Sequence, residues 1–78
     1  MRDQIIAVVS QVLGVPADLI TDDTSPETVE SWDSLRHMDL VLALEEGFGI
    51  RLTDEQILGL LDVRSIVRTV EELSRARA

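Results

Sequence analysis

The sequence predicts an all-α protein, a small four-helix bundle of three main helices and one short helix, with a long loop between the first two helices. Three segments carry apolar residues at helical spacing, and no segment alternates with period two for long enough to form a strand. Hydrophobic residues make up 45% of the 78 residues, which suffices for one core in a single domain spanning residues 1–78. Aromatic residues are only 3%, so this core must be aliphatic.

The first helix is expected over about residues 3–13. Its apolar residues recur every three or four positions, and Gly14 followed by Pro16 provides a signal for the helix to end. The apolar residues of this helix are Ile5, Ile6, Val9, Val12 and Leu13.

Residues 15–33 are expected to form the long loop, because they include two prolines and many Thr, Ser and Asp residues. Within the loop, Thr24-Ser25-Pro26-Glu27 fits a capping box and allows a brief helical turn. Four apolar residues are expected to anchor the loop against the core: Leu19, Ile20, Val29 and Trp32.

The second helix is expected from about residue 34 to residue 47. On a helical wheel its apolar residues cover a wide arc, and its charged residues face away from that arc. The expected arc consists of Leu35, Met38, Val41, Leu42 and Leu44, and the opposite face of Arg36, Asp39, Ala43 and Glu46.

The third helix has a complete start signal. Thr53 can act as its N-cap, Gln56 occupies the capping-box position, and Leu52 can pack onto Ile57. This helix is expected to be short and to end near residues 59–61.

A fourth helix follows, and Asp62 can cap its start. Its apolar residues are again spaced to face a core. They are Val63, Ile66, Val67, Val70 and Leu73.

The chain is strongly acidic, with 15 acidic residues against 7 basic ones and a net charge of −8. Such a field repels nucleic acids and anionic membranes and favours proteins with basic patches, although acidity also serves simply to keep a small domain in solution. The absence of cysteine excludes disulfides and Cys-based zinc sites, and a single histidine leaves no set of metal ligands. Without a signal peptide or membrane span, we expect a monomeric, cytoplasmic protein.

Ser34 lies at the boundary between the long loop and the second helix. It is either an N-cap or a free hydroxyl, since Asp33 can cap the helix alone. A free hydroxyl could be a catalytic nucleophile with His37, one turn further on, as its general base. Against hydrolase chemistry, no nucleophile-elbow glycines surround Ser34, and a short chain has little room for a pocket that excludes water.

A third interpretation comes from the segment that follows. Asp33-Ser34-Leu35 opens an apolar helix that continues MDLVLALEEGFGI, and the last helix is entered at DVRSIV. Together with the length and the acidity, this pattern resembles the acyl carrier protein family over essentially the whole chain. The tripeptide alone would be weak evidence, and its combination with Leu44-Glu45-Glu46-Gly47-Phe48 makes the resemblance specific.

The resemblance implies a carrier rather than an enzyme, with acyl groups held as thioesters on a 4′-phosphopantetheine arm attached to Ser34. A phosphopantetheinyl transferase would attach the arm from coenzyme A with Mg²⁺, and Asp33 matches the aspartate that helps in this transfer. The physics is consistent, because a phosphate at the first turn of a helix meets unpaired backbone N–H groups and the positive end of the helix dipole.

The resemblance also implies a surface for acyl-loading, synthase and transferase enzymes that carry basic docking patches. Asp39, Glu45 and Glu46 fall on family positions that meet such patches, and Leu35 and Met38 on positions that supply the apolar part of the surface. A solvated helix face would equally explain Asp39 and Glu46, and burial in the core would equally explain Leu35 and Met38.

Arg36 and His37 depart from the carriers of fatty acid synthesis, which usually place an acid and a small residue there. Arg36, expected on the solvent face, should therefore influence which enzymes dock without affecting the fold. The segment Ser31-Trp32-Asp33-Ser34-Leu35 resembles free-standing carriers that serve polyketide or nonribosomal peptide assembly. The alternative function is an unmodified acidic helical adaptor that binds a basic protein partner.

Overall fold

The computed structural model describes the backbone of residues 1–77 and the side chains of residues 1–76, so Ala78, the last residue of the expected domain, lies outside the described residues. Its helices are α1 (Arg2–Leu13), α2 (Ser34–Phe48), α3 (Asp54–Leu58) and α4 (Val63–Arg77), with a 3-10 turn, η1 (Ala17–Leu19), in the loop after α1. The described residues contain no strand. The expected all-α fold of three main helices and one short one is confirmed, and only η1 was not expected.

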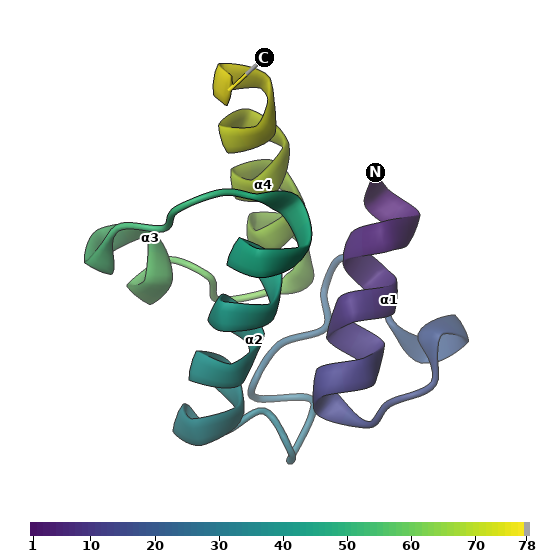
Figure 1. Cartoon of the computed structure of the whole chain (residues 1–78). Coiled ribbons are helices and arrows are strands. Elements are labelled where there is room, and N and C mark those ends of the chain that lie inside the picture. Colours follow the sequence, from purple (N-terminus) through teal and green to yellow (C-terminus); the bar gives the residue numbers. More distant parts are fainter. Residues whose placement is uncertain (78) are drawn as a thin grey trace.

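The three main helices contact one another, and the short α3 lies to one side of them (Figure 1). α1 runs antiparallel to α2, and the long loop returns the chain from the end of α1 to the start of α2. α3 lies on the side of α2 that faces away from α1. The start of α2 is therefore flanked by the loop, while α3 leaves much of the α2 surface open.

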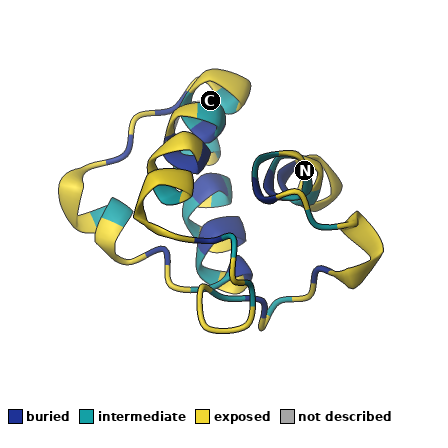
Figure 2. Ribbon diagram, turned by 90° about the horizontal axis from the view of Figure 1, so that it is seen from below, coloured by how far each residue is buried: buried dark blue, intermediate teal, exposed yellow. Residues whose placement is uncertain are grey.

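The core is aliphatic, as the composition requires, with Trp32 as its one buried aromatic residue among those described. Figure 2 shows the buried residues on the faces that the main helices turn toward one another. The core residues of the helices are Ile5, Val9 and Leu13 of α1, Leu40, Val41 and Leu44 of α2, and Val63, Ile66, Val67 and Val70 of α4.

The buried face of α2 is narrower than the helical wheel indicates, and the expectation was partly wrong. Leu40 is fully buried although it was left out of the expected arc, whereas Leu35 and Leu42 are 71% and 55% exposed. Met38 is also exposed. The reason is that α2 packs on α1 and α4 along one stripe, and α3 covers little of the rest.

The loop is held down by Ile20 and Trp32, which are buried, and by the half-buried Val29. The expectation that Leu19 also anchors the loop was wrong, because its side chain is 65% exposed. Leu19 is the last residue of η1, which contributes no buried side chain. A 3-10 turn exposes Leu19 and buries the next residue, Ile20.

The expected capping box at Thr24 was also wrong. The Thr24 hydroxyl accepts a hydrogen bond from the amide of Thr21, behind it in the chain, so it does not cap a following helix. Ser25 takes the capping role instead, since its hydroxyl accepts from the amide of Glu27 and its carbonyl accepts from the amide of Val29. One helical turn results, without a helix.

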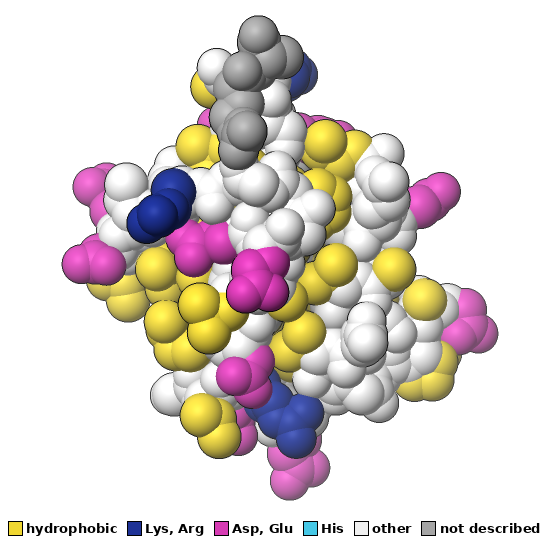
Figure 3. Space-filling model, viewed as in Figure 1, with side chains coloured by type: hydrophobic (Ala, Val, Ile, Leu, Met, Phe, Trp, Pro, Cys, Tyr) yellow, Lys and Arg dark blue, Asp and Glu magenta, His cyan; other side chains and the backbone are white. Residues whose placement is uncertain are grey.

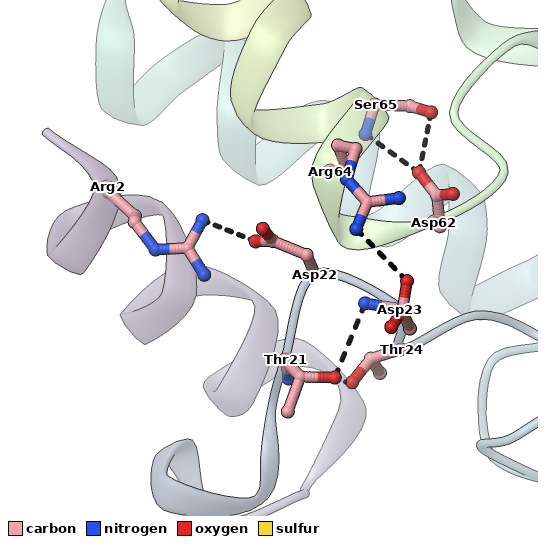
Figure 4. A network of polar contacts seen from close by, with 8 residues as sticks. All are labelled: Arg2, Thr21, Asp22, Asp23, Thr24, Asp62, Arg64 and Ser65. Atoms are coloured by element: carbon pink, nitrogen blue, oxygen red, sulfur yellow. Dashed lines mark hydrogen bonds and ion pairs between the residues drawn. The ribbon is translucent and has the colours of Figure 1, made fainter.

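Polar contacts tie the middle of the loop to both α1 and α4 (Figure 4). They combine backbone hydrogen bonds, each worth about 0.5–1.5 kcal/mol net, with exposed ion pairs that contribute little to stability on their own. The contacts are the ion pairs Arg2–Asp22 and Arg64–Asp23 and the bonds from the amides of Val63 and Arg64 to the carbonyls of Thr24 and Asp22.

The start signals of the last two helices are confirmed. The Thr53 hydroxyl accepts from the Gln56 amide, and the Gln56 side chain accepts from the Thr53 amide, which completes the capping box of α3. At α4, Asp62 Oδ1 accepts from both the amide and the hydroxyl of Ser65, at 2.8 and 2.6 Å.

The burial difference along α2 predicts unequal effects of shortening its leucines. Leu44→Ala should lower the free energy of unfolding by about 2–5 kcal/mol, because it leaves a cavity in the core. Leu42→Ala, on the exposed face of the same helix, should change it by less than about 0.5 kcal/mol. Urea denaturation of both variants checks this, and equal losses would contradict the observed α2 face.

The cap of α4 predicts a dependence of stability on pH. Hydrogen bonds from Ser65 to the Asp62 carboxylate, helped by Arg64 and Arg68, hold the pKa of Asp62 below its ordinary value of 3.8. A carboxyl group whose pKa is lowered by folding stabilises the fold above its unfolded pKa and loses that contribution as the pH falls through the folded pKa.

Asp62→Ala should therefore cost about 1 kcal/mol near neutral pH, the usual value for an N-cap. The difference between the wild type and Asp62→Ala should shrink as the pH falls below the ordinary value of 3.8. Urea denaturation across the acidic range measures this difference, and a gap that stays constant would show that ionisation of Asp62 does not contribute.

Candidate functional site

The junction between the loop and α2 gives three consecutive residues three different environments. Trp32 is buried, with 3% of its surface exposed. Asp33 has an extended backbone, and its Oδ1 accepts from the Arg36 amide at 2.8 Å, so Asp33 is the N-cap of α2 as expected. Ser34 is the first residue of the helix and is exposed.

The Ser34 hydroxyl has no structural task in the described part of the chain. Asp33 already caps the helix, and the Ser34 side chain makes no hydrogen bond to another residue among those described. The first amides of α2 have no partner inside the helix, and the cap takes up only that of Arg36. An exposed hydroxyl thus lies beside free backbone donors and the positive end of a helix dipole.

His37 is not available as a general base for Ser34. Its Nδ1 accepts from Nε1 of Trp32 at 3.0 Å, and its Nε2 lies 2.9 Å from the carbonyl oxygen of Ile57. Because the indole N–H can only donate, Nδ1 is the acceptor and Nε2 carries the proton. Both nitrogens are occupied away from Ser34, so the geometry gives no support to the hydrolase interpretation.

Exposed apolar and acidic side chains adjoin Ser34 along α2. Leu35 and Met38 are exposed, so the explanation that they are core residues is wrong. Asp39 and Glu46 are exposed as well. Figure 3 shows apolar side chains gathered where α2 and α3 lie, with acidic side chains around them. Such a mixed surface suits a partner protein with a basic patch and an apolar centre.

Two residues expected on the partner surface have structural tasks. The Arg36 guanidinium donates to the Val12 carbonyl at 2.9 Å, which ties the start of α2 to the last turn of α1. The Glu45 carboxylate accepts from the Leu52 amide at 2.8 Å and holds the chain between α2 and α3. Substituting Arg36 therefore removes a tie between helices besides changing a surface charge.

A groove of about 470 Å³ opens beside Ser34, between the start of α2 and the end of α3. It is lined by Trp32, Met38, Ile57 and Leu58, and by Ser34 itself. A larger hollow of about 650 Å³ lies over the loop, near Val15, Leu19 and Val29, and Ser34 does not line it. We consider the smaller groove the functional one because it adjoins the free hydroxyl.

The wall formed by Ile57 and Leu58 was not expected from the sequence. Ile57 appeared there only as a packing partner in the third helix. Leu58, which is 77% exposed, carries no signal other than being an apolar residue on the outer face of a short helix. The site meets the needs of a serine-linked phosphate arm, with a free hydroxyl, unpaired amides and an adjacent apolar surface.

No helix among the described residues is both long and apolar enough to span a membrane. The same residues contain no cluster of three or more His, Cys, Asp or Glu side chains arranged to hold a metal ion.

The fold and site define a small helical carrier: a bundle that displays one serine at a helix start beside an apolar groove. Comparison with known proteins agrees. Residues 3–70 match the family model described as "Phosphopantetheine attachment site". The chain is 33% identical over 70 residues to an acyl carrier protein of Helicobacter pylori and 34% identical to that of Helicobacter acinonychis, covering 90% of each chain in both cases.

A solved structure agrees with these relatives. The solution structure of holo acyl carrier protein from Geobacter metallireducens superposes with a TM-score of 0.87 and 25% identity, over 97% of this chain and 87% of that one. The chain belongs to the phosphopantetheine-binding acyl carrier protein family. It is a carrier of acyl groups on a covalently attached phosphopantetheine, not an enzyme, and it works with a phosphopantetheinyl transferase and with synthase or transferase enzymes.

The capping role of Asp33 can be tested separately from its negative charge. Asp33→Ala should lower the free energy of unfolding by about 1 kcal/mol, because the Arg36 amide loses its acceptor. Asp33→Asn should stay close to the wild type, since asparagine caps as well as aspartate does. Chemical denaturation distinguishes the two, and equal losses in both variants would show that the charge rather than the cap matters.

Proposed function

We propose that Ser34 is the attachment point of the phosphopantetheine arm. The observation that carries this proposal is the exposed Ser34 hydroxyl, which is free of intramolecular bonds at the first residue of α2 while Asp33 does the capping. A phosphodiester formed there would lie next to unpaired amides at the helix start, which favour an anion. The arm supplies a terminal thiol that holds acyl groups as thioesters.

The attachment step makes modest demands on this chain. The Ser34 oxygen forms a bond to the phosphorus of the coenzyme A diphosphate that bears the pantetheine, the adenosine bisphosphate leaves, and the hydroxyl proton passes to a base of the transferase. Asp33 uses one carboxylate oxygen for its cap. Its second oxygen points to no donor among the described residues and can meet the Mg²⁺ of the transferase complex.

We further propose that partner enzymes dock on the exposed face of α2 that extends from Ser34 toward the end of the helix, defined by Leu35, Met38, Asp39 and Glu46. All four side chains are exposed. The apolar pair supports the centre of a docking surface, and the acidic pair supports attraction to a basic patch. Arg36 and Glu45, also expected to bind partners, contribute through the positions of the helix and loop that they hold.

The context of the carrier is also part of the proposal. We propose that the carrier works in the cytoplasm and as a monomer, and the net charge of −8 supports the monomer because it disfavours self-association. Arg36 and His37, in place of the acid and small residue of fatty acid synthesis, support a role in polyketide or nonribosomal peptide assembly.

Enzymatic loading followed by mass spectrometry tests the attachment point. With coenzyme A, Mg²⁺ and a promiscuous phosphopantetheinyl transferase, the wild type should gain the mass of one phosphopantetheine. Ser34→Ala should gain nothing. Ser25→Ala, which removes a loop serine that caps a turn, should load like the wild type. Loading of Ser34→Ala would overturn the proposal, as would failure of the wild type to load.

A further inference from the structure

His37 joins three segments that are separate in the sequence. Through Nδ1 it binds the Trp32 indole of the loop, and through Nε2 the Ile57 carbonyl of α3, while its own backbone belongs to α2. The Trp32 and His37 ring planes differ by 21°, with centroids 6.2 Å apart. A donor–acceptor distance of 3.0 Å with this geometry places the rings side by side, joined edge to edge, rather than stacked face to face.

Besides this hydrogen bond, α3 is held by the part-buried Ile57, which packs against the core, and by the buried Leu52 and Leu60 on either side of it. It is five residues long and contributes no buried residue, and its contacts with the main helices are few. Within residues 1–77, the contact between His37 and Ile57 is the one side-chain hydrogen bond that links α2 to α3. A helix this short is not stable on its own, so its position depends on such contacts.

The two hydrogen bonds of His37 form a bridge from Trp32 to Ile57. This bridge forms one wall of the groove beside Ser34. Trp32, His37 and Ile57 all line this groove, and Met38 and Leu58 complete its apolar surface. The indole N–H and both imidazole nitrogens already make hydrogen bonds within the bridge. The two rings therefore present apolar carbon atoms to the groove and no free polar group. The groove is therefore suited to an apolar group.

We propose that His37 is a positioning residue: by bridging Trp32 and Ile57 it holds α3 beside the start of α2 and so keeps the groove shaped for the branched, apolar part of the attached arm. This inference rests on the proposed attachment at Ser34. Because Ser34 itself lines the groove, the occupant is the part of the arm nearest the phosphate, where a carbon bears two methyl groups. Those methyls would cover Met38 and Leu58, which are 46% and 77% exposed.

Nuclear magnetic resonance of the loaded protein tests the groove. In the wild type, nuclear Overhauser effects should connect the two methyl groups of the arm with the side chains of Met38 and Leu58. His37→Ala should lose these effects while still accepting the arm. His37→Gln, which retains one donor and one acceptor, should recover part of them. Glu72→Gln, which removes an exposed carboxylate on α4 away from the groove and from the docking surface, should behave like the wild type.

Hydrogen exchange of the unloaded proteins tests the bridge without the arm. Losing a hydrogen bond of ordinary strength should speed exchange of the α3 amides by roughly three- to tenfold in His37→Ala. Exchange in α1 should stay unchanged.

The outcomes separate the two proposals. If the wild type loads at Ser34 but its arm shows no contact with Met38 or Leu58, the groove inference is overturned and the attachment point stands. Contacts that persist unchanged in His37→Ala overturn the role of His37. A failure to load at Ser34 defeats the proposed function, and unchanged exchange of α3 in His37→Ala defeats the bridge independently.

Discussion

The junction at Trp32-Asp33-Ser34 is the constraint on which the rest of the structure depends. Trp32 pins the end of the loop to the core, and the Asp33 cap sets the residue at which α2 begins. A register shift of one residue would turn the α2 side chains by about 100° and carry Leu40 and Leu44 out of the core. The same junction therefore fixes the packing of α2 and leaves Ser34 exposed.

Local signals in the sequence were sufficient to predict much of the fold. The caps at Asp33, Thr53 and Asp62 each bond to the amide of the residue three positions further on. The local sequence pattern therefore identifies both partners of each bond. The burial of each side chain was harder to predict, because it depends on which other helices pack against it. Leu42 lies on an apolar arc that nothing covers, and Leu40 is buried because α1 and α4 both pack on α2.

The functional site also combines features that depend on neighbouring residues with features that depend on residues distant in the sequence. The sequence allowed a free Ser34 hydroxyl, since Asp33 can cap α2 alone, and the observed Asp33 cap leaves that hydroxyl free. The tasks of Arg36 and His37 did not follow, because their partners Val12 and Ile57 are 24 and 20 residues away and meet them only in the folded chain. Both residues make contacts that position helices around Ser34.

A carrier needs one exposed point of attachment, a surface that partners can find, and no reactive group of its own to intercept the cargo. This chain has the free Ser34 hydroxyl, exposed acids along α2, and no cysteine. The most direct measurement is tandem mass spectrometry of the enzymatically loaded protein after cleavage at arginine. The arm should be found on Ser34 in the fragment that ends at Arg36, and an arm on any other serine of that fragment would contradict the account.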